Sequence, residues 1–173
     1  LSNIKKVEEL EEKYQAYQYY LDAVKRDGVP YELITKALPT IEGEVNDILA
    51  QLVDFQILFE MDGKNINNYI VYDDDNTWPL ELSSGMERFI SSLAIRVGLI
   101  NVSNLPRSNF LAIDEGWGTM DSDNLNSVYS LFQYLKSQFQ FTMIVSHIDS
   151  MRDAVDTLLE VKKEKGYSNI MFD

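Results

Sequence analysis

Residues 4–24 carry apolar side chains at helical spacing. The spacing predicts a helix with a heptad seam of about three repeats, which would need a partner strand. An amphipathic helix that lies on its own domain fits the same pattern, so both interpretations stay open. The apolar positions recur every three or four residues, with Lys, Glu and Gln between them, at Ile4, Val7, Leu10, Tyr14, Tyr17, Leu21 and Val24.

The sequence DGVP at 27–30 is typical of a helix end. Pro30 can open a short helix that runs through Leu38, because proline suits the first helical position. Thr40 then fits as the N-cap of another helix. That helix has one apolar face, formed by Ile41, Val45, Ile48, Leu49 and Leu52.

The next stretch alternates apolar and polar positions. Residues 54–60 and 68–72 alternate, and DGKN at 62–65 separates them. This pattern predicts a β-hairpin. The acidic run DDDN at 73–76 lacks the glycine and distal glutamate of a calcium loop, so it predicts a solvated turn.

From residue 80 onward, predicted helices and strands alternate. We expect helices at 84–100, 122–138 and 149–154, and strands at 109–113, 141–145, 157–161 and 168–172. Such alternation implies a mainly parallel sheet with helices packed on it. The predicted fold class is therefore α/β, with a small β-hairpin.

Composition narrows the possible functions. The 173 residues are 45% hydrophobic, contain no cysteine and carry a net charge of −13. These values fit one folded domain and exclude disulfide or thiolate–metal frameworks.

We see no signal peptide and no apolar run near the roughly 20 residues of a membrane span, so we expect an intracellular protein without membrane contact. Position 1 is Leu rather than Met, from which we expect a fragment. The acid excess opposes unaided binding to nucleic-acid backbone.

Two adjacent acids, Asp114 and Glu115, follow the apolar segment FLAI at 110–113. A buried parallel strand delivers its last residues to the ligand crevice of an α/β sheet. In a nucleotide hydrolase, the first acid of such a pair holds the Mg²⁺ shell and the second polarises the attacking water. Taken alone, however, the pattern is more typical of a strand that runs into an acidic loop.

A capped helix start precedes these acids. Ser84 and Glu87 have the spacing of a capping box, which places backbone N–H groups, a hydroxyl and the helix dipole at one spot. Such a terminus can bind phosphate. An ordinary capped helix also needs Ser and Glu but gives no reason for Gly85. The single histidine, His147, follows the predicted strand at 141–145, at the same sheet edge as the acid pair.

In this order and spacing, the motifs resemble the C-terminal half of an ABC-type ATPase head of SMC-like chromosome and repair proteins. LSSGMER at 82–88 is similar to the signature motif, FLAIDE at 110–115 to the Walker B strand, GTMD at 118–121 to the D-loop, and His147 to the switch histidine. GVP at 28–30, ALP at 37–39 and IEGEVNDIL at 41–49 look like the corresponding segment of SbcC-type double-strand-break repair ATPases. The resemblance covers nearly the whole chain.

The chain departs from the family pattern in two places. Ser84 replaces the first glycine of the signature motif, and Met86 stands at its acidic or amide position. Contact of Ser83 and the Gly85 backbone with phosphate should survive these changes. The sequence also contains no Gly-x-x-x-x-Gly-Lys-Ser/Thr loop to cradle the β- and γ-phosphates.

The resemblance implies half of a composite head, with residues 1–27 as a coiled-coil root and residues 28–173 as the C-terminal lobe. It implies ATP and Mg²⁺ as cofactors, an N-terminal Walker A lobe of the same protein, and a second head in an ATP-dependent dimer. Such a fragment is expected to be inactive as an ATPase by itself. In this resemblance, Asp114 binds Mg²⁺ and Glu115 is the general base. Ser83, Ser84 and Gly85 contact the nucleotide across the dimer. Asp121 couples the two sites, and His147 senses the γ-phosphate.

An SbcD-like nuclease and DNA are implied as partners of the full assembly. The expected location is the cytoplasm or nucleoid if the source is prokaryotic or viral, and the nucleus if it is eukaryotic. An SMC-like DNA-organising head without a nuclease partner is one alternative. A non-catalytic interaction module is another, which Met86 favours and which Glu115 and His147 oppose. A metal-dependent nuclease is a third, although one acid pair and one histidine make a poor two-metal site.

Overall fold

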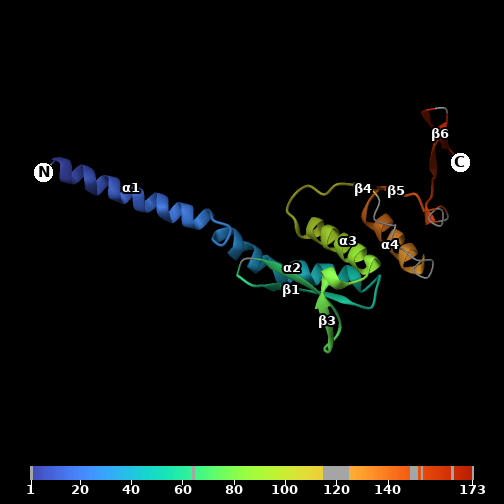
Figure 1. Ribbon diagram of the computed structural model, residues 1–173, viewed down its shortest axis with the longest axis horizontal. Helices are drawn as coiled ribbons and strands as arrows, with labels where there is room; N and C mark the ends of the chain where they lie inside the picture. The colour runs from blue at the N-terminus through green and yellow to red at the C-terminus, as the bar shows by residue number, and fades with distance from the viewer. Residues whose placement is uncertain are drawn as a thin grey trace.

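The computed structural model describes residues 2–63, 65–114, 125–148, 152, 154–164 and 166–172. Its N-terminal helix, α1 (Ser2–Val24), extends away from the rest of the chain (Figure 1). The predicted helix is confirmed. Its seven seam side chains, from Ile4 to Val24, are between 50% and 68% exposed. The interpretation that this helix lies on its own domain is therefore wrong.

Helix α2 (Val29–Leu49) begins at the predicted break and is continuous, with Pro39 in its interior. The expected stop at Leu38 and the N-cap at Thr40 are therefore wrong. Proline removes one helical hydrogen bond, which leaves the Thr35 carbonyl without its usual donor. Thr35 and Pro39 are exposed, so water can donate a hydrogen bond to that carbonyl. Burial of Leu38 and Val45 on either side of the proline holds the helix together.

Three antiparallel strands form the first sheet, β1 (Gln56–Met61), β2 (Ile66–Asp73) and β3 (Asn76–Pro79), in that order. The predicted hairpin is confirmed, whereas the short third strand was not expected. The predicted turn at 73–76 is also confirmed, because the Asp73 carboxylate accepts hydrogen bonds from the backbone N–H groups of Asp75 and Asn76, each at 3.0 Å. Helix η1 (Leu80–Leu82) follows β3.

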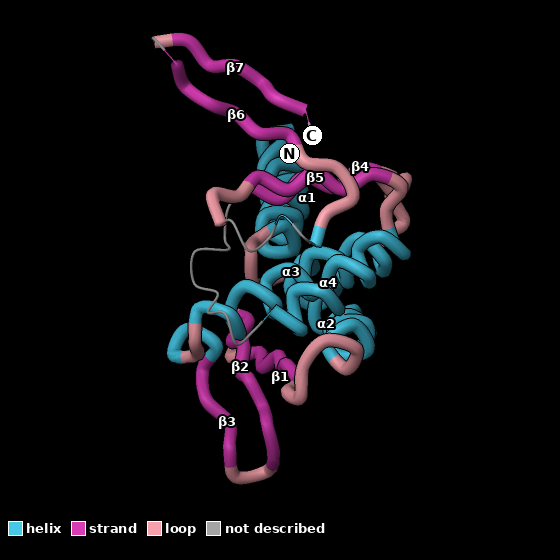
Figure 2. Tube along the Cα trace, turned by 90° about the vertical axis from the view of Figure 1, so that its right-hand side faces the viewer, coloured by secondary structure: helices cyan, strands magenta, loops and turns pink. Residues whose placement is uncertain are grey.

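Helix α3 (Gly85–Val102) packs against α2, and α4 (Leu125–Gln138) lies beside α3 (Figures 1 and 2). Strands β4 (Phe110–Asp114) and β5 (Phe141–Val145) form a parallel pair, with Asp114 opposite Val145. The expected segments at 84–100, 109–113, 122–138 and 141–145 correspond to these elements, apart from residues 122–124, which lie outside the described residues. The α/β class is confirmed.

Strands β6 (Leu159–Glu164) and β7 (Tyr167–Phe172) form an antiparallel hairpin that extends away from the helices (Figure 2). Among the described strands, only β4 and β5 pair in parallel, so the sheet is less parallel than expected. The cause is the connection, because a short turn joins antiparallel strands and a parallel pair needs a crossover such as α4. Most of the helix expected at 149–154 lies outside the described residues.

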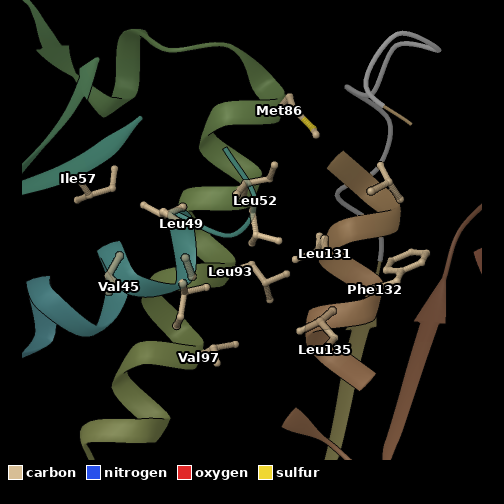
Figure 3. Packing of buried hydrophobic residues seen from close by; sticks show 14 of the residues in the cluster. Val45, Leu49, Leu52, Ile57, Met86, Leu93, Val97, Leu131, Phe132 and Leu135 are labelled. Atoms are coloured by element: carbon tan, nitrogen blue, oxygen red, sulfur yellow. The ribbon is translucent and has the colours of Figure 1, made fainter. Parts of the chain in front are cut away.

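One apolar cluster joins α2, α3, α4, the sheet β1–β3 and the strand pair β4–β5. Figure 3 shows Leu93 of α3 and Leu131 of α4 on the facing sides of their helices, with Leu49 of α2 beside α3. Full burial of one such side chain contributes about 1.5–3 kcal/mol. This cluster therefore fixes the three helices relative to one another. Among the described residues, no helix is long and apolar enough to cross a membrane.

Candidate functional site

The first turn of α3 is closed by a complete capping box. The Ser84 hydroxyl accepts a hydrogen bond from the Glu87 backbone N–H at 3.3 Å, and the Glu87 carboxylate accepts one from the Ser84 backbone N–H at 2.5 Å. The N–H groups of Gly85 and Met86 have no partner within the helix, because the first turn of any helix lacks carbonyl partners. This terminus therefore presents donors and the positive end of the helix dipole to solvent.

Ser83 and Ser84 differ in what their hydroxyls can do. Ser83 is 8% exposed, and its hydroxyl donates to the Leu80 carbonyl oxygen at 2.7 Å. Its one proton is therefore not free for a phosphate oxygen in this conformation. Ser84 is exposed, and its hydroxyl acts as an acceptor in the capping box, which leaves its proton for another acceptor. The geometry thus favours Ser84 as the hydroxyl that meets a ligand at this terminus.

Met86 points into the apolar cluster toward α4 and is 9% exposed (Figure 3). This side chain is apolar and offers no hydrogen-bond donor to a phosphate. Its backbone N–H, in contrast, belongs to the first turn of α3, where helical partners are lacking. Position 86 can therefore serve a bound phosphate through its backbone only.

Glu87 links the start of α3 to strand β2. Its second carboxylate oxygen accepts a hydrogen bond from the Tyr72 hydroxyl at 2.5 Å. Burial, followed by the bond to Glu87, raises the pKa of Tyr72 to about 12, so the phenol remains a donor at neutral pH. Burial alone would raise the pKa of Glu87, but the bonds from Tyr72 and Ser84 outweigh it and hold that pKa below its usual value. Sequence analysis missed Tyr72, because nothing local connects it with the cap.

A pocket of about 490 Å³ lies beside this terminus. Its wall includes the loop after α2 and side chains of β2 and α3. The pocket makes room for a ligand or a partner side chain next to the capped start of α3. Its lining residues are Ala50, Gln51, Leu52, Val53, Asp54, Phe55, Tyr72, Ser84, Met86, Glu87 and Ile90.

The second candidate region is the carboxyl edge of β4 and β5. Asp114 ends β4, and His147 follows Val145, the residue opposite Asp114, by two positions. Because the pair is parallel, both residues come to the same edge, as the sequence predicts. Both are exposed. Glu115 and Asp121 lie outside the described residues.

A carboxylate in this position suits Mg²⁺. This ion prefers oxygen ligands, keeps several waters and is bound through one or two carboxylates together with substrate phosphates. Asp114 supplies one such carboxylate. Within the described ranges, no group of three or more His, Asp or Glu side chains could hold a metal ion.

Solved structures define the class of this fold. The chain matches an SMC ATPase, from work on ATP-driven dimerization and DNA-stimulated activation of SMC ATPases, with a TM-score of 0.67 and 16% identity over 82% of this chain and 88% of that chain. It matches the Smc head domain of Pyrococcus furiosus, which has an extended coiled coil and is bound to the C-terminal domain of ScpA, with a TM-score of 0.65 and 17% identity over 99% of this chain and 42% of that chain. The fold is that of an SMC head domain.

Curated relatives are consistent with this class, although no family model matches the chain. In an alignment 171 residues long that covers 90% of this chain, it is 37% identical to uncharacterized protein R555 of Acanthamoeba polyphaga mimivirus. In an alignment 93 residues long that covers 51% of this chain, it is 32% identical to the SbcC component of the nuclease SbcCD from Staphylococcus aureus (strain JH9). The matches span only 13% and 9% of these two relatives. Fold and sequence together are consistent with a C-terminal SMC/SbcC-like ATPase half-head.

Proposed function

We propose that this chain is the C-terminal half of an ATP-hydrolysing head that dimerises on ATP and controls the binding or processing of DNA. The observation that carries the proposal is the capped start of α3 together with Asp114 at the carboxyl edge of a parallel strand pair, both within an SMC head fold. The first feature suits a phosphate and the second suits the metal that accompanies it.

An uncovered face of β4 and β5 supports the composite nature of this head. Phe141, Met143 and Val145 alternate along β5 on one face and are 59%, 44% and 45% exposed. Phe110, 48% exposed, stacks on Phe141 with ring centroids 5.5 Å apart. Parallel strands are usually covered on both faces. In our proposal, the N-terminal Walker A lobe of the same protein covers this face.

The residues take separate roles in the proposed site. Asp114 would hold Mg²⁺, which when bound supplies positive charge to the phosphate oxygens. Glu115 would accept a proton from the attacking water, and His147 would donate a hydrogen bond to the γ-phosphate. Asp121 would couple the two sites of the dimer.

The start of α3 would bind the nucleotide held by the second head. The Ser84 hydroxyl and the N–H groups of Gly85 and Met86 would donate hydrogen bonds to the phosphate. Ser83 would stabilise the preceding turn through its hydrogen bond to Leu80. A helix terminus of this kind binds the phosphate with backbone donors and the helix dipole.

Helix α1 would form the coiled-coil root, within residues 1–27. Its exposed seam is made of the apolar positions that a second helix would cover. The Smc head of Pyrococcus furiosus, which this chain matches over 99% of its length, carries an extended coiled coil. The other strand would come from the longer protein, on the way to its Walker A lobe.

The curated match to the SbcC component of SbcCD favours a nuclease partner of the SbcD kind and a role in DNA repair. A second candidate is an SMC-like DNA-organising head without a nuclease, favoured by a solved Smc head that is bound to ScpA. A pull-down with an SbcD-like nuclease and with a ScpA-like protein would separate the two candidates.

The test of the main proposal is ATP hydrolysis by this chain alone, by a candidate Walker A lobe alone, and by the two mixed or joined. We expect turnover only when both lobes are present. Glu115→Gln should then abolish turnover and keep ATP binding, whereas the exposed Glu60→Gln should change neither. Full turnover in the Glu115→Gln protein would refute the assignment of the base. ATP binding without any hydrolysis by the unaltered pair would favour the non-catalytic interaction module.

A further inference from the structure

The Tyr72 side chain connects strand β2 to the start of α3. Tyr72, one residue before the end of β2, donates its hydroxyl proton to Glu87 at 2.5 Å. The other oxygen of the same carboxylate accepts the Ser84 backbone N–H, also at 2.5 Å. Glu87 therefore joins the sheet on one side to the cap of α3 on the other.

The Tyr72 ring is itself held in place. It stacks on Trp78 of β3 with a centroid distance of 5.4 Å and packs against Phe55 at 5.6 Å. Packing of the ring on both neighbours restricts its rotamers, so the hydroxyl stays directed at Glu87. Tyr72→Phe would keep this ring packing and remove only the hydroxyl.

The sheet that carries Tyr72 is anchored to α2. The Asn46 side chain exchanges two hydrogen bonds with the backbone of Ile57, at 2.8 and 2.9 Å, and Glu42 accepts one from the Phe59 N–H at 2.7 Å. Since α2 also packs closely on α3, the sheet and the two helices form one support. Tyr72 therefore ties the start of α3 to a fixed part of the lobe.

Without the Tyr72 hydroxyl, one oxygen of Glu87 would lose a charge-assisted hydrogen bond, and the carboxylate could rotate away from the Ser84 N–H. The cap would then hold the first turn of α3 less firmly. A site built for a phosphate needs its donors in place before the phosphate arrives, because a small misplacement costs much of the binding or rate advantage.

We propose that Tyr72 is a positioning residue that acts through Glu87 to hold the first turn of α3 ready for the phosphate of a nucleotide bound by the second head. This inference rests on the proposed function, since it concerns the same terminus. It adds a residue that lies outside the sequence motifs, and it makes the sheet β1–β3 part of the support for the site.

The test uses the complete protein, in which this chain is joined to its Walker A lobe. We expect Tyr72→Phe to lower turnover at saturating ATP about five- to tenfold, the size of effect that loss of one supporting hydrogen bond has on a transition state. ATP binding by the single head should stay within about twofold, because the Walker A lobe carries that step. Tyr69→Phe, a hydroxyl removed from the same strand away from Glu87, is the matched control.

Variants at Glu87 separate positioning from general stability. Glu87→Ala should lower turnover at least as much as Tyr72→Phe, whereas Glu87→Gln should retain most of it, since glutamine also completes a capping box. Adding Tyr72→Phe to Glu87→Ala should lower turnover no further, because Tyr72 acts through that side chain. Thermal melting of each variant shows whether folding has changed.

Three results would overturn the inference: equal turnover of Tyr72→Phe and Tyr69→Phe, additive losses in the double variant, or a Tyr72→Phe protein that loses ATP binding and turnover in proportion. Glu115→Gln is run in the same preparation. If that variant kept full turnover, the proposed function itself would fail, which distinguishes the two failures.

Discussion

Helices α2 and α3 pack closely against each other at Gly98. A Cβ atom added there would lie 2.9 Å from Cγ2 of Val45 and 3.5 Å from the Val45 backbone nitrogen. Val45 is 0% exposed and β-branched, so it has little room to move aside. Gly43, in the interior of α2, would bring its Cβ within 4 Å of nothing. Gly98→Ala and Gly43→Ala therefore make the same chemical change at a tight site and at an open one.

The two changes differ only in packing. Alanine is about 1 kcal/mol more favourable than glycine inside a helix, so both variants gain this amount. An extra methyl group in a filled core costs about 1–3 kcal/mol, which only Gly98→Ala incurs. We expect Gly43→Ala to raise the free energy of unfolding by about 0.5–1 kcal/mol and Gly98→Ala to lower it by up to about 2 kcal/mol. The two variants should therefore differ in free energy of unfolding by about 1–3 kcal/mol. The gain in helix propensity is common to both and cancels in this difference.

Urea denaturation followed by circular dichroism at 222 nm measures these free energies. Val45→Ala in the Gly98→Ala background supplies a further check, because removal of Cγ2 should recover part of the packing loss and give favourable coupling between the two sites. If Gly98→Ala stabilised the chain as much as Gly43→Ala, α2 and α3 would not approach as closely as described, and the reasoning would be refuted.

Three other predictions concern single contacts. Asn46→Ala should lower the free energy of unfolding by about 1–3 kcal/mol in urea denaturation, because both backbone polar groups of Ile57 lose their partner; an unchanged midpoint would contradict this. Absorbance titration near 295 nm should show one phenol with a pKa of about 12 that disappears in Tyr72→Phe. Since the folded-state pKa is raised above the ordinary value near 10, the stability from protonated Tyr72 is complete below about pH 10 and is lost as the pH rises through about 12. Leu131→Ala, at a side chain 1% exposed, should cost about 2–5 kcal/mol, whereas Leu159→Ala, at one 54% exposed, should change little.

Local signals predicted most of the elements that surround the candidate site. The capping box at Ser84 and Glu87 was recognisable from its spacing, and the structure contains both of its hydrogen bonds. The strand at 141–145 was expected with the bounds that β5 has. Its parallel pairing with β4 then brings Asp114 and His147 to one edge, as the alternation of strands and helices predicts.

Errors occurred where a distant contact outweighed a local signal. Pro39 predicted a helix boundary, but burial of apolar residues before and after it keeps α2 continuous. This outcome depends on which face of the segment the rest of the fold covers. The roles of Ser83, Ser84 and Gly85 at the nucleotide stay predictions; in the described conformation the Ser83 hydroxyl donates to Leu80 and Ser84 is exposed.

The sequence by itself determined helices α1, α3 and α4, the strand pair that carries Asp114, and the capped start of α3, because period, capping and turn signals act over a few residues. Only the tertiary structure decided that Tyr72 meets Glu87, that Gly98 lies against Val45, and that one face of β4 and β5 is uncovered. These features join residues far apart in the chain or depend on which surfaces meet. Their energies come from packing and burial, which a local pattern does not contain.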